Sequence, residues 1–324
     1  MSRPFPFQLR IPAFAAPMFL VSGPELVIAA CKAGTIGAFP TPNCRTSEEL
    51  DDWMSEITDA LASAQSANPT HPVAPWAANL VTHSTNTRLP ADLKLVAKHK
   101  PPIVITALGS PRPAVELVHD YGGYVFADVV DIKLARKAVD AGVDGLACIS
   151  AGAGGHTGHL SPLAFVSAVR EFFDGWIVVG GGIADGAGIA GAVASGGDLV
   201  YIGTRFLATY ESLASAPYKQ MVVDCGPDDL LISSAVTGTP ASWLKPSLKA
   251  AGIPTDGSAE HSKRNYSSDD SSHRRWKDVW AAGQGLQKIT SIEWVAAVVA
   301  RLEREYVAAS ERFLSLAPCK GPRT

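Results

Sequence analysis

Residues 177–205 read IVVGGGIADGAGIAGAVASGGDLVYIGTR, and this stretch holds one complete strand–helix–strand unit. An apolar run at 177–179 leads into a glycine triplet, an alanine-rich segment follows at 186–194, and a second apolar run occupies 199–202. Strands of a parallel sheet read as short, nearly continuous apolar runs, because both of their faces are buried. The stretch therefore predicts a βαβ unit of a parallel sheet.

The same alternation recurs along the chain from residue 11 to residue 205. The apolar runs that we expect to form strands are residues 13–16, 36–39, 74–79, 103–106, 124–127, 145–149, 177–179 and 199–202. The amphipathic segments that we expect to form helices between them are residues 24–33, 47–64, 91–98, 111–119, 132–141, 162–173 and 186–194. Eight such units in about 200 residues are typical of a (β/α)8 TIM barrel, so we predict an α/β fold of this type.

Beyond the last of these units the alternation stops. We expect residues 211–282 to form a smaller, mostly helical lid or substrate subdomain, which includes a polar, mobile stretch at 255–273. A further helix is predicted at 291–316, because its apolar residues recur on one face. The predicted organisation is a barrel made of residues 1–210 and 283–324, with the subdomain inserted near the C-terminal end.

Composition and charge narrow the class of protein. The chain has 324 residues, of which 47% are hydrophobic and 18% charged, and its net charge is −3. This charge argues against a nucleic-acid or anionic-membrane partner, and no apolar run is long enough for a membrane span or a signal sequence. The five cysteines are odd in number and lack metal-site spacing, which is typical of reduced thiols. We expect a soluble cytoplasmic protein without disulfides or a bound metal.

Two glycine-rich junctions follow the seventh and eighth predicted strands. One contains Gly180, Gly181 and Gly182, and the other contains Gly203 and Thr204. Loops after the last two strands of a TIM barrel frequently hold a phosphate group with their backbone N–H groups. Neither glycine cluster has GxGxxG spacing, so a Rossmann dinucleotide site is not supported. We predict phosphate binding at these loops, and the alternative is a pair of tight turns without a ligand.

A third glycine-rich loop, residues 152–158, follows the sixth predicted strand and contains a histidine. Glycines such as Gly154 have no Cβ, so a planar ligand can approach the backbone closely. His156 has a reference pKa of about 6.5 and can accept or donate a proton near neutral pH. The loop predicts a flat cofactor or substrate beside a proton-handling group, and the alternative is a mobile turn with a surface histidine.

These loops occur together with other short motifs that resemble the nitronate monooxygenase family, formerly called 2-nitropropane dioxygenases. The matching segments are APM at 16–18, WAANL at 76–80, AGGHTG at 153–158, GGG at 180–182, GTRF at 203–206 and WAAGQG at 280–285. The resemblance extends over nearly the whole chain, and the GGHTG and GTRF segments are its most specific parts. It implies an FMN-dependent barrel.

The resemblance also implies roles for individual residues. The residues that would line the flavin ring are Pro17, Met18, Phe19 and Asn79, with Gly154 approaching it. Those that would bind the phosphate are Gly180, Gly181, Gly182, Gly203 and Thr204. His156 would act as a base or a hydrogen-bond donor while O2 oxidises an alkyl nitronate, or a nitroalkane deprotonated in the site, to a carbonyl compound and nitrite. Such a protein would detoxify nitroalkanes with a small-molecule substrate and O2 as its partners; a homodimer is left open.

Three further polar residues are candidates for contact with the substrate or the cofactor. Many relatives carry a lysine near the flavin where this chain has Asp128, and an aspartate cannot supply positive charge to a reduced flavin. The sequence favours Asp128 as the cap of the following helix over a second active-site group. His83 faces the substrate or, as the favoured alternative, lies exposed in its loop. Gln284 covers the flavin edge or belongs to a simple tight turn.

Other functions fit parts of the same pattern. NAD(P)H-dependent flavin reductases, of the enoyl-acyl carrier protein or quinone reductase type, share a similar glycine–histidine loop. A flavin-free barrel, such as an isomerase or a lyase, would use the phosphate loops for a phosphorylated substrate. A non-catalytic flavin binder ranks last, because simple binding does not require His156.

Overall fold

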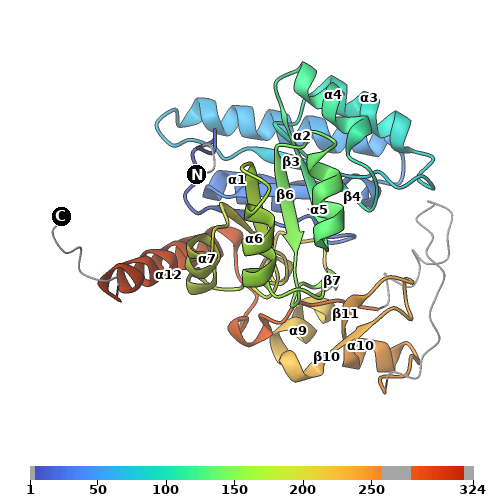
Figure 1. Ribbon diagram of the computed structural model, residues 1–324, viewed down its shortest axis with the longest axis vertical. Helices are drawn as coiled ribbons and strands as arrows, with labels where there is room; N and C mark the ends of the chain where they lie inside the picture. Colours follow the sequence, from blue (N-terminus) through green and yellow to red (C-terminus); the bar gives the residue numbers. More distant parts are fainter. Residues whose placement is uncertain (1–3, 257–278, 317–324) are drawn as a thin grey trace.

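The computed structural model describes residues 4–256 and 279–316, and its centre is a closed barrel of eight parallel strands (Figure 1). The strands are β1 (Ala13–Ala15), β2 (Ile36–Pro40), β3 (Trp76–Val81), β4 (Ile103–Ala107), β5 (Tyr124–Val129), β6 (Gly145–Ile149), β8 (Trp176–Gly180) and β9 (Leu199–Ile202). They follow one another in this order around the barrel, and β9 closes it by pairing with β1. The predicted TIM barrel is confirmed, and each predicted strand coincides with an observed one.

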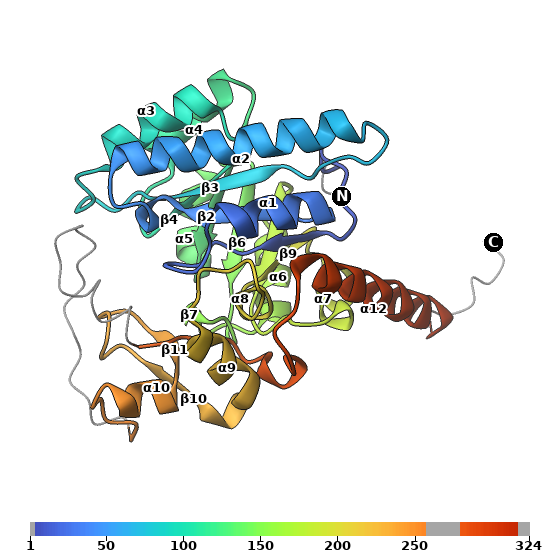
Figure 2. The ribbon, with the colours of Figure 1, turned by 180° about the vertical axis from the view of Figure 1, so that it is seen from behind.

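Helices surround the barrel and connect its strands. They are α1 (Pro24–Ala33), α2 (Ser47–Ala67), α3 (Leu89–His99), α4 (Arg112–Asp120), α5 (Ile132–Val139), α6 (Pro162–Arg170), α7 (Gly186–Ala194) and the short α8 (Thr204–Leu207). The chain returns to the barrel with α12 (Val295–Leu316), which packs against α1 and α7 and extends away from the body at its far end (Figure 2). Polar side chains start several of these helices, because a side-chain oxygen of Thr46, Asp131, Ser161 or Asp185 accepts a hydrogen bond from the first turn.

Apolar side chains fill both sides of the barrel wall. The barrel interior contains a set of interlocking aromatic rings, among them Phe14, Phe126, Trp176 and Tyr201. The rings of Phe14 and Tyr201 are 5.2 Å apart between centroids, and those of Phe14 and Phe126 are 5.9 Å apart, both in edge-to-face geometry. The barrel is therefore a packed core, and ligands can approach only at its ends.

A smaller subdomain lies beyond the C-terminal ends of the strands (Figure 1). It contains α9 (Ala216–Asp224), the 3-10 turn η2 (Pro227–Asp229), β10 (Leu230–Ser233), β11 (Ala241–Leu244) and α10 (Lys245–Ala250). The antiparallel pair β10–β11 is an addition to the helices that the sequence predicts. Most of the predicted polar stretch at 255–273 lies outside the described residues, and the predicted limits of the subdomain stay a prediction. No helix in the described part of the chain is both long and apolar enough to cross a membrane.

Candidate active site

Three glycine loops and a fourth segment from the C-terminal part of the chain meet at the mouth of the barrel. The backbone N–H of Gln284 donates a 2.9 Å hydrogen bond to the carbonyl of Gly152, in the loop after β6. A Cβ on Gly152 would lie 3.0 Å from the Gln284 side-chain oxygen, and one on Gly182 would lie 3.7 Å from the Gln284 Cβ. Gln284 therefore sits between the loops after β6 and β8, with its side chain exposed.

The loop after β9 joins the same cluster through Thr204. Its hydroxyl oxygen accepts a 2.9 Å hydrogen bond from the N–H of Gly283. A Cβ on Gly154 would lie 2.7 Å from the Gly283 nitrogen, so a side chain cannot be placed there without displacing the backbone. On the other side, a Cβ on Gly203 would lie 3.7 Å from the sulfur of Met18. We name the loops at 152–154, 180–182, 203–204 and 283–285 the glycine cradle.

His156 is held at this mouth by backbone pairing with the subdomain. Together with Gly155 it forms the short strand β7 (Gly155–His156), which pairs antiparallel with β11 so that His156 lies opposite Ala241. The next residue, Thr157, donates hydrogen bonds from its N–H to Pro240 and from its hydroxyl to Ser150. The Nε2 atom of His156 is shielded from solvent. Hydrogen bonds therefore hold the backbone at His156, and its Nε2 atom does not lie on the surface, which differs from the alternative of an unpaired surface turn.

Asp128 is a strand residue and does not cap a helix, so the favoured sequence interpretation was wrong. The side chain of Asp131 caps α5 by accepting a hydrogen bond from the N–H of Leu134 at 2.7 Å. Strand β5 continues to Val129, so Asp128 lies within the strand and belongs to the barrel wall. Its carboxylate accepts a 3.3 Å hydrogen bond from the hydroxyl of Tyr201 on β9. Burial raises the pKa of Asp128 to about 7, and the hydrogen bond from Tyr201 partly opposes this shift.

The remaining candidates lie at the ends of the first and third strands. The segment Pro17, Met18 and Phe19 follows β1 and is half-buried. Asn79 on β3 is buried, and its amide donates a 3.4 Å hydrogen bond to the carbonyl of Ile105. His83 lies in the loop after β3, where its Nδ1 atom is 2.9 Å from the hydroxyl of Thr85. These side chains lie at the same end of the barrel, and the sulfur of Met18 lies beside Gly203 of the glycine cradle.

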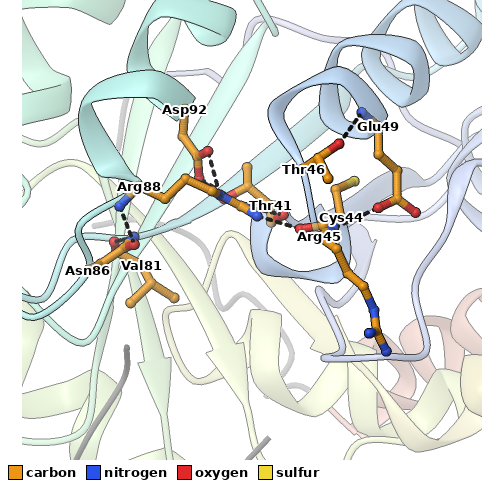
Figure 3. Close-up of polar contacts among 9 residues, drawn as sticks. All are labelled: Thr41, Cys44, Arg45, Thr46, Glu49, Val81, Asn86, Arg88 and Asp92. Carbon is orange, nitrogen blue, oxygen red and sulfur yellow. Dashed lines mark hydrogen bonds and ion pairs between the residues drawn. The ribbon is translucent and has the colours of Figure 1, made fainter. Parts of the chain in front are cut away.

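The sequence interpretation missed a polar cluster that joins two loops at the barrel mouth (Figure 3). Arg88, at the start of α3, donates from Nε to the Asp92 carboxylate at 2.9 Å, and also donates to the carbonyls of Thr41 and Cys44. The Thr41 hydroxyl donates to the same carboxylate at 2.7 Å, and Asp92 is fully buried. The cluster ties the loop after β2 to the start of α3. Its only sequence signal is the i, i+4 spacing of Arg88 and Asp92, which is common on helix surfaces.

Comparison with known proteins agrees with this geometry. The sequence model of the nitronate monooxygenase family matches residues 6–304. The chain belongs to this family.

Curated relatives of this family member have low sequence identity to it, and the matched region covers only part of each of them. A nitronate monooxygenase from Neurospora crassa is 29% identical over 245 residues, which cover 66% of this chain and 64% of that protein. A (3aS,4S,5R,7aS)-5-hydroxy-7a-methyl-1-oxo-octahydro-1H-indene-4-carboxyl-CoA dehydrogenase from Rhodococcus jostii is 27% identical over 237 residues, covering 73% of this chain and 63% of that protein. The chain thus spans slightly less than two thirds of the length of these relatives.

Solved structures share the whole fold. Nitroalkane oxidase from Streptomyces ansochromogenes superimposes with a TM-score of 0.79 at 22% identity, covering 94% of this chain and 98% of that one. FabK from Thermotoga maritima superimposes with a TM-score of 0.76, also at 22% identity, covering 95% and 96%. At 22% identity these structures support the barrel fold alone. The substrate of this nitronate monooxygenase family member has to be inferred from its own residues.

Proposed function

We propose that this chain binds FMN and oxidises alkyl nitronates, or nitroalkanes that it first deprotonates, with O2 to a carbonyl compound and nitrite. The observation that carries the proposal is the position of His156 on a strand that continues directly from the glycine cradle. A histidine beside a glycine-rich backbone cradle is expected where a proton acceptor must face a bound cofactor. Family membership supports the flavin.

The glycine cradle fits the phosphate end of such a cofactor. Gly181 and Gly182 have φ values of +152° and +69°, which residues with a Cβ rarely adopt, so this turn favours glycine at both positions. Backbone N–H groups in such a turn bind anions without a side-chain charge. We assign the phosphate to residues 180–182, Gly203 and Thr204, and the ring to Pro17, Met18, Phe19, Asn79 and Gly154. The cofactor would supply electron transfer and the reaction with O2.

The protein's part in the reaction is to hold the substrate and handle its proton. A neutral imidazole at His156 accepts the proton from the carbon next to a nitro group, whereas a protonated imidazole donates a hydrogen bond to a nitronate oxygen. The Nε2 atom is shielded from solvent, so water does not compete strongly for a hydrogen bond that a substrate would make there. His83, Asp128 and Gln284 remain candidates for contacts with the substrate or the cofactor edge.

The absorption spectrum of the purified protein tests this proposal. We expect the visible bands of bound FMN, and their bleaching when an alkyl nitronate is added without oxygen. Admission of air should restore the bands and release nitrite. A colourless protein that added FMN does not restore would instead support a flavin-free barrel, and bands that no substrate bleaches would support a non-catalytic binder.

A second candidate is a flavin reductase that takes electrons from NAD(P)H, or a flavin dehydrogenase that passes them to NAD(P)⁺. The observation in its favour is that the relative from Rhodococcus jostii is named as a CoA-ester dehydrogenase and matches more of this chain than the Neurospora crassa nitronate monooxygenase does. Rapid anaerobic bleaching by NADPH or NADH, with no bleaching by nitronates, would decide for this candidate. The cytoplasmic location and the homodimer stay predictions.

Replacing Gly181 by alanine is expected to weaken FMN binding at least tenfold and to lower the free energy of unfolding by about 1–3 kcal/mol. The added Cβ would lie 2.6 Å from the Ala151 carbonyl oxygen, at a φ of +152°. The matched control is Gly191→Ala on the exposed side of α7, where a Cβ meets no atom within 4 Å. It should raise the unfolding free energy by about 0.5–1 kcal/mol and leave FMN affinity unchanged. Fluorescence titration with FMN and urea unfolding measure both effects; equal FMN affinity in the two variants would exclude residues 180–182 as the phosphate site.

A further inference from the structure

The interior of the barrel ends in a polar pair at the mouth. Side chains alternate along a strand, so Asp128 points to the same interior face as Tyr124 and Phe126, one layer nearer the C-terminal end of β5. Its carboxylate accepts the hydrogen bond from the Tyr201 hydroxyl described above. The Tyr201 ring packs on Phe14 inside the barrel. The pair therefore forms the polar upper surface of the aromatic core.

Tyr201, one member of this pair, lies next to the glycine cradle. A Cβ on Gly180 would be 3.5 Å from the Cβ of Tyr201, so the strand that carries Tyr201 supports the turn at 180–182 from below. Register pairs Gly180 with Tyr201 across β8 and β9. Through its hydrogen bond with Tyr201, Asp128 therefore lies on the side of the barrel mouth toward which the ring of a ligand with its phosphate in the cradle would extend.

The surroundings of Asp128 supply no positive charge to hold its carboxylate ionised. On β6 its register partner is Ala147, and β4 ends beside it in Ala107. Within the described residues, Tyr201 on β9 is the titratable group that acts on Asp128, and no charged side chain shifts its pKa. Desolvation dominates, which is why this pKa lies near 7 and well above that of an ordinary aspartate.

Resting on the proposed flavin function, we propose that Asp128 takes up a proton when the bound FMN is reduced. Two electrons from the substrate place negative charge on the cofactor above this carboxyl group, and two neighbouring negative charges repel each other. One proton from solvent then moves to a carboxylate oxygen of Asp128. The hydrogen bond from the Tyr201 hydroxyl holds the Asp128 carboxyl group in position. A positively charged side chain would offset the negative charge of a reduced cofactor. In this chain, protonation of Asp128 instead removes the negative charge that would repel it.

The test is the reduction potential of the FMN-loaded protein as a function of pH, in the wild type and in Asp128→Asn. Below pH 6 the two should coincide, because Asp128 is already protonated. Above pH 7 the equilibrium constant for reduction should fall more steeply with pH in the wild type than in Asp128→Asn. The extra fall should be about tenfold per pH unit, which lowers the reduction potential of a two-electron couple by about 30 mV per pH unit. Tyr201→Phe removes the hydrogen bond that lowers the pKa of Asp128. In this variant, the pH at which the slope of the reduction potential changes should therefore be higher than in the wild type.

The matched control is Asp131→Asn, which removes the same charge three residues away at the cap of α5. Its potential should follow the wild type at every pH. If Asp128→Asn does not fold, the infrared difference spectrum between reduced and oxidised wild type at pH 8 should show a newly protonated carboxyl group. Parallel potential curves for wild type and Asp128→Asn, or the absence of that infrared band, would overturn this inference while leaving bound FMN and the proposed function intact. A protein that binds no FMN would overturn both.

Discussion

Replacing His156 by asparagine is expected to lower kcat/KM for a neutral nitroalkane by about 10²–10⁴-fold, the usual contribution of a general base. Asparagine keeps a hydrogen-bond donor but cannot accept the proton. The fold should be retained, because the backbone of β7 pairs with β11 independently of the imidazole. Oxygen consumption and nitrite release under steady-state conditions measure the effect.

The same variant separates the two roles proposed for this histidine. If His156 is a base, activity on a preformed nitronate should survive in His156→Asn, since that substrate has already lost its proton. If it acts only as a hydrogen-bond donor, His156→Asn should keep activity on both substrates, because the asparagine amide still donates. The control is His159→Asn in the same loop, where the side chain is exposed, and it should retain wild-type rates. Full turnover of a neutral nitroalkane by His156→Asn, with FMN still bound, would eliminate the base role.

Replacing Arg88 by methionine is expected to lower the free energy of unfolding by about 3–5 kcal/mol. The substitution keeps the length of the side chain but leaves the Asp92 carboxylate buried without its positive partner. It also removes the hydrogen bonds to the carbonyls of Thr41 and Cys44 (Figure 3). Urea unfolding of the purified protein gives the change directly.

A surface ion pair on the same helix provides the control for this effect. Lys98 lies near the end of α3 and pairs with Asp51, and its side chain is 58% exposed. Lys98→Met should leave the unfolding midpoint close to that of the wild type, because solvent already screens the pair. If Arg88→Met and Lys98→Met had equally small effects, the buried cluster would not stabilise the loops at the barrel mouth.

The repetitive part of the fold was accessible from the sequence because its signal is local. Each strand of the barrel is a short apolar run bounded by turn residues, and each helix has an apolar face, so the positions of both can be read from a few neighbouring residues. The positions of the glycine-rich loops and of His156 at one end of the barrel could be predicted from the sequence for a similar reason. They follow directly after strands, and the ends of parallel strands meet at one side of a barrel.

Features that depend on contacts between distant segments were not accessible. The pairing of His156 with Ala241, and the hydrogen bond between Thr204 and Gly283, join residues whose separation in sequence gives no periodic signal. Asp128 was misplaced because one residue decides whether a position belongs to a strand or to the turn after it. The sequence contains two aspartates before the helix, and only the fold shows that Asp131 caps it.

The pairing of β7 with β11 also determines when the site can exist during synthesis. The loop that carries His156 leaves the ribosome well before β11 and before the segment that closes the cradle at Gly283. Until those later segments emerge, the barrel strands can associate, but the histidine has no strand partner and the cradle lacks its fourth loop. If the cradle binds FMN as proposed, the binding site is complete only after residue 283 has been synthesised, so we expect cofactor binding to follow assembly of the barrel strands.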